Sequence, residues 1–382
     1  MPTPPLSDEL LTEAVTARRE HGSVTAAALA LGIPRTTLHS RLSEAAARGL
    51  DGSVPEPLPE GRTISGVSTL YDADGKVRAQ WVKTKTEPDT LDIIREAVEA
   101  LKEELPRISP TKGPEHVSGD LLNQYTITDS HFGMLAWQEE TGTSYDLSIA
   151  EQLLLDWFSA AIAMSPPAHT AVLAQLGDLM HHDALESVTP THKHVLDADS
   201  RLQKVIRVVI RVIRQVIAML LEKHQHVHIV MASGNHDPAS SAWLREMLAA
   251  MYEGEPRVSV DNSPSLYYAY EWGKTALFFH HGHRRGIRDV DAVFAGIFRA
   301  MFGRCTKAYA HVGHLHSNEV KSTNLMEVER HETLAAPDAH AAGGGWLSGR
   351  SAKVITYSKR GGEVSRITLS AEAVQGWREA AE

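Results

Sequence analysis

The order of hydrophobic and polar positions divides the chain into an N-terminal helical part and a longer part in which strands and helices alternate. Over residues 7–48 the apolar spacing predicts three short helices. Ser23 can cap the second of them, expected over 24–31, and Gly32 suits the left-handed position after it. Pro34 then begins the third helix, where its fixed φ costs nothing. The core positions expected in this part are Ala27, Leu29, Leu31, Leu38, Leu42 and Ala45.

A segment with a weaker hydrophobic pattern follows and extends to about residue 118. Its first part, DGSVPEPLPEGR over 51–62, is rich in Pro and Gly and predicts a linker. Next, ISGVSTLY and KVRAQWVKTK flank an Asp-Ala-Asp-Gly turn at 72–75 and predict a β-hairpin. The basic residues and tryptophan of its second strand could contact phosphates, or could protect a solvated edge strand. Apolar residues at 3-4-3-4 spacing predict a helix over 89–105, where two heptads favour packing on the main domain over dimerisation.

From about residue 119 the pattern alternates between strands and helices, which indicates an α/β fold. Helices are predicted over 146–163, 199–223, 239–252 and 288–302, and the last 65 residues are expected to form mainly strands. The segment 199–223 is full of β-branched residues, but its length and a basic residue at every third or fourth position favour a helix. This basic stripe is either a solvated face or a track for nucleic acid. It comprises Arg201, Lys204, Arg207, Arg211 and Arg214.

Composition limits the class of protein. The 382 residues suffice for two or three domains, and 42% hydrophobic with 23% charged residues is typical of soluble globular proteins. Because no signal peptide or membrane span is evident and Cys305 is the single cysteine, we expect a cytoplasmic protein without membrane contact. The net charge of −10 argues against a protein that coats DNA generally, although a local basic path remains compatible with it.

The distribution of histidine is the most informative feature of the composition, because 18 of the 21 histidines lie from His131 onward. A pH-sensing surface could explain this skew, but the histidines cluster beside Asp, Asn and Gly directly after apolar runs, which favours metal ligation. Ends of strands that meet at one edge of a sheet can gather such side chains from distant parts of the sequence. The clusters are Asp129-Ser130-His131, Gly177-Asp178, Gly234-Asn235-His236-Asp237, His281-Gly282 and Gly313-His314-Leu315-His316.

These clusters form a split ligand set for two metal ions and predict a metal-dependent phosphoester hydrolase. Two cations about 3.5–4 Å apart bind the anionic phosphoryl oxygens and lower the pKa of a shared water. Ligands that combine imidazole, carboxylate and amide oxygen suit Mn²⁺ best, with Fe²⁺, Zn²⁺ or Ni²⁺ as alternatives, and suit Mg²⁺ alone less well. The absence of cysteine among them fits a catalytic rather than a closed structural zinc site.

Taken as a set, the five clusters resemble the motifs of the calcineurin-like metallophosphoesterase superfamily over 119–320. The resemblance implies a four-layer α-β-β-α sandwich of two mixed sheets, preceded here by a small all-α domain. The ligands that it implies for the first metal are Asp129, His131, Asp178 and His316. Asp178 would bridge to a second metal, whose other ligands would be Asn235, His281 and His314.

The resemblance also implies roles beside the metals. His236 would stabilise the transition state or protonate the leaving oxygen, and Asp237 would orient His236. Three histidines lie at one strand end, and His281 is chosen over His280 and His283 because it directly precedes a glycine, as in the superfamily.

One position favours a nuclease within that superfamily. His181 stands three residues after Asp178, which is similar to the SbcD-type DNA-repair nucleases, although His182 could take its place. The protein phosphatases of the superfamily have Asp-Arg-Gly after this motif and glutamate after Gly-Asn-His, and this chain has neither. Arg284 and Arg285 follow the His281 strand end and are predicted to meet substrate phosphates, unless they belong to an ordinary charged helix start.

The N-terminal part resembles the helix-turn-helix of small transcription factors and resolvases over about 25 residues. A helical oligomerisation or docking module is the alternative, since five basic residues balance five acidic ones over the first 50. The arrangement of the whole chain is similar to phage and prophage metallophosphoesterases. On the helix-turn-helix interpretation, the third helix of the N-terminal part would offer to a DNA groove the residues Arg35, Thr36, Thr37, Ser40 and Arg41.

We therefore predict a helix-turn-helix domain over 1–50, a linker with a hairpin and a helix over 51–118, and a catalytic domain over 119–382. The leading hypothesis is a dinuclear-metal DNA nuclease in a bacterial host cytoplasm, with DNA as partner and a homodimer left open. An ATPase partner is not expected, because few residues remain after the last histidine motif for a capping domain. The rival hypotheses are a phosphodiesterase or pyrophosphatase for small nucleotides and a non-catalytic phage DNA-binding or assembly factor.

Overall fold

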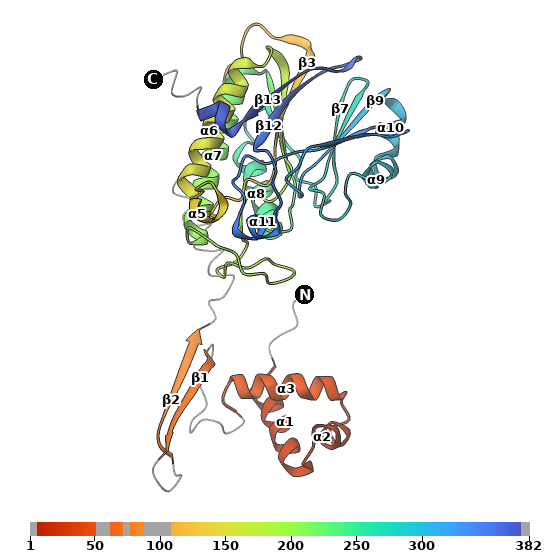
Figure 1. Ribbon diagram of the computed structural model, residues 1–382. Helices are drawn as coiled ribbons and strands as arrows, with labels where there is room; N and C mark the ends of the chain where they lie inside the picture. The colour runs from red at the N-terminus through yellow and green to blue at the C-terminus, as the bar shows by residue number, and fades with distance from the viewer. Residues whose placement is uncertain (1–5, 51–61, 72–76, 87–107, 376–382) are drawn as a thin grey trace. The chain divides into compact units, whose positions relative to one another are not determined.

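The computed structural model describes residues 6–50, 62–71, 77–86 and 108–375, which fall into two compact units, Met1–Ala100 and Leu101–Glu382 (Figure 1). The predicted linker over 51–62, except Arg62, which begins a strand, lies outside the described residues, as do the turn at 72–75 and the predicted helix over 89–105.

The first unit contains the three predicted helices, α1 (Asp8–His21), α2 (Val24–Ala30) and α3 (Arg35–Ala47). Ser23 caps α2 as predicted, because its hydroxyl accepts a hydrogen bond from the Ala26 amide at 3.1 Å. The prediction that Leu29 belongs to the core is wrong: its side chain is 85% exposed, and Ala28 is buried beside Ala27 instead. Residues two apart on a helix do not share a face, so Leu29 cannot point inward together with Ala27.

The predicted hairpin is also present in the first unit. Strands β1 (Arg62–Tyr71) and β2 (Val77–Thr86) pair antiparallel, with Val67 opposite Val82.

The second unit contains a six-stranded mixed sheet. Its order is β13-β12-β3-β4-β5-β6, in which β3 to β6 run parallel and β12 pairs antiparallel with both β13 and β3. The strand bounds are β3 (Ser118–Ile127), β4 (Ala168–Gln175), β5 (His226–Met231), β6 (Val258–Val260), β12 (Ser351–Ser358) and β13 (Gly362–Ser370).

A second mixed sheet has five strands in the order β10-β11-β9-β8-β7. Its central strands β8, β9 and β11 are parallel, and the edge strands β7 and β10 are antiparallel to their neighbours. The bounds are β7 (Tyr268–Trp272), β8 (Thr275–Phe279), β9 (Lys307–Val312), β10 (Glu319–Ser322) and β11 (Glu327–Arg330).

Helices flank the two sheets, and three of the predicted ones are present at nearly their predicted bounds. The fourth, predicted over 288–302, is divided at Phe298, whose backbone leaves the helical region (φ −101°, ψ 36°). Gly296, just before the break, lowers the helix preference there. The helices of this unit are α5 (Gln138–Thr141), α6 (Leu147–Met164), α7 (Leu202–Lys223), α8 (Pro238–Met251), α9 (Val290–Ile297), α10 (Arg299–Arg304) and α11 (Ala339–Gly344).

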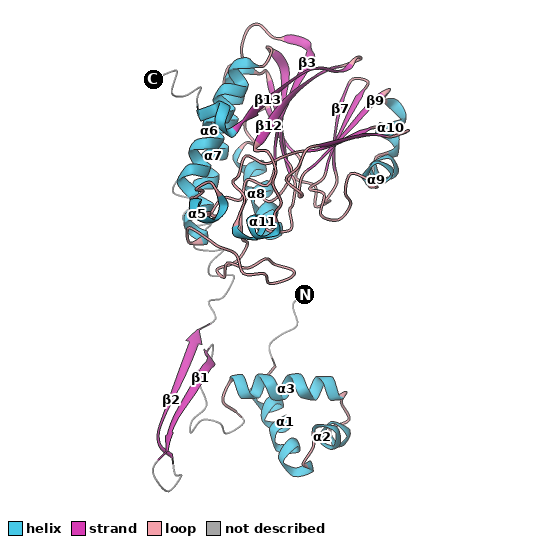
Figure 2. Cartoon of the chain, in the orientation of Figure 1, coloured by secondary structure: helices cyan, strands magenta, loops and turns pink. Residues whose placement is uncertain are grey.

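Three hydrophobic cores show that these elements stack as four layers, as predicted (Figures 1 and 2). The largest core joins α6, α7 and α8 to the six-stranded sheet and includes Trp157 and Phe158. The second lies between the two sheets, where Leu122 and Phe279 meet. The third joins the five-stranded sheet to α9 and α10 and includes Phe294. Burial of these apolar surfaces holds the layers together.

Among the described residues, α6 alone is long and apolar enough to cross a membrane by length and composition. The core helix of a folded domain can satisfy the same test, and Leu154, Trp157 and Phe158 of α6 are buried in the largest core.

Candidate metal centre

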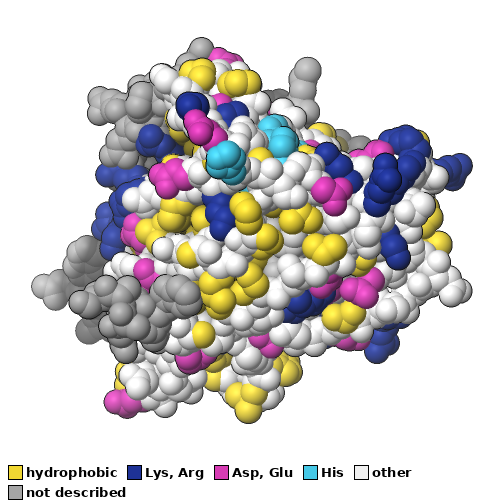
Figure 3. Space-filling view, turned by 90° about the horizontal axis from the view of Figure 1, so that it is seen from above, with side chains coloured by type: hydrophobic (Ala, Val, Ile, Leu, Met, Phe, Trp, Pro, Cys, Tyr) yellow, Lys and Arg dark blue, Asp and Glu magenta, His cyan; other side chains and the backbone are white. Residues whose placement is uncertain are grey.

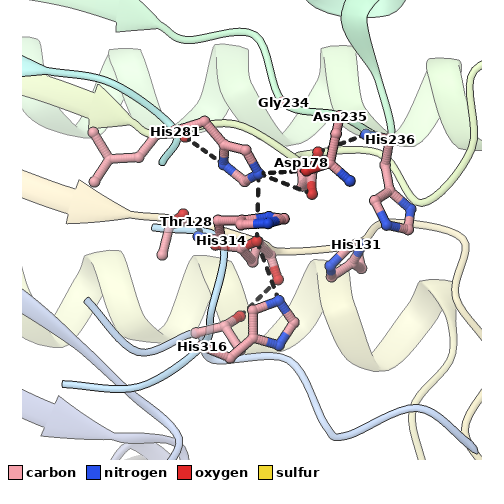
Figure 4. A network of polar contacts seen from close by, with 12 residues as sticks. Thr128, His131, Asp178, Gly234, Asn235, His236, His281, His314 and His316 are labelled. Atoms are coloured by element: carbon pink, nitrogen blue, oxygen red, sulfur yellow. Dashed lines mark hydrogen bonds and ion pairs between the residues drawn. The ribbon is translucent and has the colours of Figure 1, made fainter. Parts of the chain in front are cut away.

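All the predicted ligands lie on loops that directly follow strands of both sheets. Asp129 and His131 follow β3, Asp178 follows β4, and Asn235 follows β5. From the other sheet, His281 follows β8, and His314 and His316 follow β9. In Figure 4 the labelled ones among them, which are all except Asp129, converge on one space from separate strand ends. The two facing sheets thereby bring together residues that are up to 187 positions apart, from Asp129 to His316.

The backbone at these loops is strained. Six described non-glycine residues have a positive φ, between 45° and 76°, and five of them are predicted ligands. This left-handed conformation is uncommon for residues with a Cβ, although Asp, Asn and His tolerate it best. Strain of this kind persists where the surrounding structure holds a functional geometry. The five are Asp129, His131, Asp178, His314 and His316.

Three glycines allow the loops to approach one another. A Cβ on Gly234 would lie 1.9 Å from Asp178 Oδ1, and one on Gly313 would lie 1.9 Å from the Thr128 hydroxyl. A Cβ on Gly177 would lie 2.6 Å from His281 Nδ1. Because each of these neighbours supports the centre, packing requires all three glycines, and at Gly177 a positive φ of 107° requires one as well.

The two aspartates are each fixed by one carboxylate oxygen. Asp178 Oδ1 accepts a hydrogen bond from the His236 amide at 2.8 Å, and Asp129 Oδ2 accepts from the His314 amide at 2.9 Å and from the Thr128 hydroxyl. The other oxygens face imidazoles: Asp178 Oδ2 lies 3.1 Å from His281 Nε2. Asp129 Oδ1 is buried without a hydrogen-bond partner and lies 3.1 Å from His316 Nε2. One oxygen of each aspartate is therefore free to bind a cation.

Burial of two carboxylates makes the centre attractive to positive charge. Burial alone would raise the pKa of Asp129, but the charges of His316 and His281 outweigh it and lower the pKa. Burial opposes protonation of His281, yet Asp178 and Asp129 raise its pKa to about 9. Without a metal, an imidazolium thus supplies the charge that the carboxylates require. The pKa of His131 is well below its usual value, because of burial and the neighbouring His236 and His181, so its ring is neutral and ready to bind a metal.

The donor atoms of the predicted ligands fall into two groups, each of a size that one ion could occupy, and a third group at the centre, His131, His181 and His236, shares His131 with the first. His131 contributes to the first group, and within each group the donor atoms lie within 4.8 Å of one another. The first group is Asp129, His131 and His316, and the second is Asp178, His281 and His314. The Asn235 side-chain oxygen is 3.1 Å from His281 Nε2 and can join the second group. This mixed set of nitrogen and oxygen donors fits two divalent transition-metal ions.

Geometry selects His281 from the three neighbouring histidines. Its Nδ1 bonds the Leu176 carbonyl oxygen at 2.9 Å, which leaves Nε2 facing the carboxylates, an arrangement common for metal-binding histidines. His280 instead bonds the Leu266 carbonyl and stacks on Tyr267, with ring centroids 4.5 Å apart. His283 lies in the adjacent cleft and belongs to no group of metal-competent donors among the described residues.

His181 lies at the centre, in contact with His131 and His236. Its Nδ1 is 3.2 Å from His131 Nδ1, and its ring stacks on that of His236 at 5.6 Å. Burial and the charge of His236 lower the pKa of His181 to about 3. His182 is also buried but makes none of these contacts, so His181 is the better placed of the two.

The predicted pairing of His236 with Asp237 is wrong. His236 Nδ1 bonds the backbone carbonyl of His181 at 2.8 Å, and Asp237 accepts from the amides of Met180 (3.1 Å) and Gly234 (3.2 Å). Burial and the charge of Asp178 raise the pKa of Asp237 to about 7. Its carboxyl group therefore ties two ligand-bearing loops together and does not orient the imidazole of His236. Backbone hydrogen bonds of this kind leave no mark in a sequence motif.

A cleft with a volume of about 940 Å³ opens beside the centre. Asn235, His236 and His314 line it, together with the loop over 189–197 and residues 338–340. Arg284 lines the cleft, whereas Arg285 is exposed but does not line it.

The residues predicted to contact DNA belong to the other unit. Arg35, Thr36 and Ser40 are exposed on α3, and Thr37 and Arg41 are half-buried.

Two supporting residues escaped prediction. Thr128 bonds Asp129, and its place directly before the first motif was the available signal. Arg245 lines the cleft from the middle of α8, where its spacing resembles that of any helical residue.

No protein-family profile and no curated protein sequence matches this chain. Solved structures that it resembles include a predicted phosphoesterase from Streptococcus pneumoniae (11% identity, 66% of this chain and 99% of that one, TM-score 0.25). Another is a novel archaeal phosphodiesterase (13% identity, 65% of this chain and 99% of that one, TM-score 0.34). A third is a dimetal phosphatase from Danio rerio (10% identity, 66% of this chain and 99% of that one, TM-score 0.34). Structural similarity at such low identity and TM-score does not assign an activity to this chain. The chemistry is therefore inferred from the geometry of the centre.

Proposed function

We propose that this protein is a metallophosphoesterase of the calcineurin-like type, which hydrolyses phosphodiesters with two divalent metal ions. The observation that supports this most is a pair of donor groups assembled from strand ends of the two sheets. One group is Asp129, His131 and His316, and the other is Asp178, His281 and His314. Backbone strain at five of these six positions supports a functional rather than a structural origin.

Two bound metals would polarise the phosphoryl oxygens and activate a water for attack on phosphorus. The protein's own groups account for the rest of the chemistry. The hydrogen bond from His236 Nδ1 to the His181 carbonyl fixes the ring of this cleft-lining residue, and Nε2 makes no hydrogen bond to any described residue. From there His236 would stabilise charge on the departing oxygen or protonate it. His181 holds the rings of His131 and His236 in place by contact with both.

DNA is the substrate that we propose first, in agreement with the position of His181 and with the N-terminal helices. Arg35, Thr36 and Ser40 on α3 are exposed and could meet a DNA groove. We propose Mn²⁺ as the resident metal, because the donors combine nitrogen and oxygen.

A small nucleotide is the second candidate substrate. Outside the histidines, the cleft carries two basic residues, Arg245 and Arg284, and two acidic ones, Asp197 and Asp338. This balance suits a short substrate better than a long polyanion, which needs a continuous basic surface. On the face seen in Figure 3, Lys and Arg side chains stand in separate groups with Asp and Glu among them.

Cleavage assays test the proposal. Purified protein with Mn²⁺ would be incubated with linear, circular and single-stranded DNA, and in parallel with bis(p-nitrophenyl) phosphate. Asp178→Ala and His236→Ala should each remove cleavage, whereas His116→Ala, at an exposed position away from the cleft, should not. Cleavage of the ester but not of DNA would favour the small nucleotide. Inactivity toward every substrate, or undiminished activity of both variants, would refute the proposal.

A further inference from the structure

Arg245 is a buried cation without a carboxylate partner. Its residue is only 5% exposed, yet no described Asp or Glu lies within ion-pair distance. Its Nη1 donates to the Met231 carbonyl at 2.9 Å and to the Ser233 hydroxyl at 3.0 Å, both neutral acceptors. A guanidinium stays charged at any physiological pH, and burial of an unpaired charge is costly. The position of this charge therefore calls for an anion from outside the chain.

The remaining donors of Arg245 are left for a ligand. Nε and Nη2 make no hydrogen bond to any described residue, and neither is sealed from solvent. The side chain lines the cleft together with Ser233 and His236. The guanidinium Cζ lies over the ring of Tyr268, 5.8 Å from its centroid, and this contact limits the movement of the side chain. One edge is thus held by the protein, and the other is open to a ligand.

The position of Arg245 relative to the centre suggests which anion it meets. Ser233, its hydrogen-bond partner, stands two residues before Asn235 on the loop that carries this predicted ligand. The scissile phosphate would be bound at the metals, so Arg245 is free for another group. Planar paired N–H donors match phosphate oxygens well.

We propose that Arg245 forms a subsite for a second phosphate of a nucleotide substrate, adjacent to the phosphate that is hydrolysed. The subsite rests on the proposed phosphodiesterase function and specifies its substrate class. Such a substrate carries the neighbouring phosphate either along a nucleic-acid chain or within a diphosphate.

Matched esters test the subsite. Turnover of thymidine 5′-(p-nitrophenyl phosphate) would be compared with that of its 3′-phosphorylated counterpart and of the p-nitrophenyl ester of thymidine 5′-diphosphate. The readout is the ratio of kcat/KM for a two-phosphate ester to that for the one-phosphate ester. Partial loss of metal or folding cancels in this ratio. We expect the wild-type protein to favour at least one two-phosphate ester by about ten- to a hundredfold. The reason is that the free energy of hydrogen bonds to charged groups corresponds to a change in affinity of this size.

The variants are Arg245→Gln, Arg245→Lys and, as a control, Arg299→Gln on the exposed surface of α10. Arg245→Gln should bring the ratio close to one, Arg245→Lys should give an intermediate ratio, and Arg299→Gln should leave it unchanged. Preference for the 3′-phosphorylated ester would indicate a phosphate along a nucleic-acid chain, and preference for the diphosphate ester would indicate a nucleoside diphosphate. A wild-type ratio near one for both esters, or a preference retained in Arg245→Gln, would overturn the subsite.

Calorimetry gives a readout that needs no turnover. Thymidine 3′,5′-bisphosphate should bind the wild-type protein at least about tenfold more tightly than thymidine 5′-phosphate, and Arg245→Gln should remove this difference. If no ester is hydrolysed, the proposed function fails, while calorimetry still decides whether Arg245 binds a phosphate.

Discussion

Two clusters of histidine and carboxylate in the second unit look alike in composition but differ in their surroundings. One is the candidate metal centre at the strand ends. The other is His311, Glu329 and His331, buried between the sheets, whose donor atoms also lie within 4.8 Å of one another. Composition and spacing alone would nominate both as metal sites.

Charge separates the two clusters. Glu329 already pairs with Lys353 Nζ at 2.5 Å and Arg366 Nη1 at 3.0 Å, so its negative charge is compensated by the protein and is not available to a metal ion. His311 is likewise engaged, with Nδ1 2.9 Å from His331 and Nε2 3.0 Å from the Tyr357 hydroxyl. At the centre, in contrast, two aspartates face imidazoles, and no described Lys or Arg pairs with them.

Backbone conformation separates them too. His311 and Glu329 occupy regular positions on β9 and β11, opposite each other in the ladder. Five residues of the centre have a strained left-handed backbone. We conclude that negative charge without a Lys or Arg partner, held on strained loops, indicates the metal site, and that the second cluster is a structural network.

The largest effect is expected for Asp178→Ala. Removal of the carboxylate of the second donor group should lower hydrolysis by about a thousandfold or more, because metals contribute several kcal/mol to the reaction. Elemental analysis should find fewer than two metal ions per chain. Glu329→Gln serves as the matched control, and its metal content should equal that of the wild-type protein.

Glu329→Gln should instead reduce stability. The variant leaves the buried Lys353 without a carboxylate partner, whereas Arg366 keeps its ion pair with Glu363, and the loss should lower the free energy of unfolding by about 3–5 kcal/mol. Chemical denaturation would measure this loss. A metal ion released by the variant, with stability unchanged, would reverse the roles given to the two clusters.

His236→Ala should lower kcat by about a hundred- to a thousandfold while both metals stay bound. The reason is that His236 lines the cleft and belongs to neither of the two donor groups that we assign to the metals. Steady-state kinetics with elemental analysis would check this, and loss of metal together with activity would show that His236 is a ligand.

The affinity of the centre for metal ions should rise with pH between pH 7 and 9. The stability that the second cluster contributes should not change in this range. The pKa of His281 is raised to about 9, so the contribution of its ion pairs to the metal-free fold is complete below about pH 6.5 and disappears as pH rises through 9. A metal must displace that proton, so its affinity should increase by about tenfold per pH unit between pH 7 and 9. Calorimetric titration at three pH values would measure the slope, and a flat profile would contradict the assignment of His281.

The second cluster responds to acid. Burial opposes ionisation of Glu329, but His331, His311 and Lys353 lower its pKa to about 2. Its stabilising contribution is therefore present above about pH 4.5 and is lost as pH falls toward 2. The stability of the Glu329→Gln variant should lack this dependence.

Much of the fold follows from the sequence because its signals are local. Ser23 caps its helix, and the stretch over 199–223 forms a helix despite its β-branched residues, since hydrophobic periodicity acts over one element. The single helix predicted over 288–302 is wrong, because its hydrophobic periodicity continues past Gly296, which lowers the helix preference just before the break at Phe298.

The ligand-bearing loops were also predictable, since Asp, Asn, His and Gly after apolar runs mark strand ends. What the sequence could not supply are contacts made through the backbone or across the cleft. Asp237 bonds two amides instead of His236, and Arg245 reaches the cleft from within a helix. Only the tertiary arrangement determines such pairings.

The most direct test of the account is a crystal structure of the protein grown with Mn²⁺, with the metals located by their anomalous scattering. We predict two ions, one between Asp129, His131 and His316 and one between Asp178, His281 and His314, and none at His311 and His331. An empty centre, or an ion bound at Glu329 instead, would contradict it.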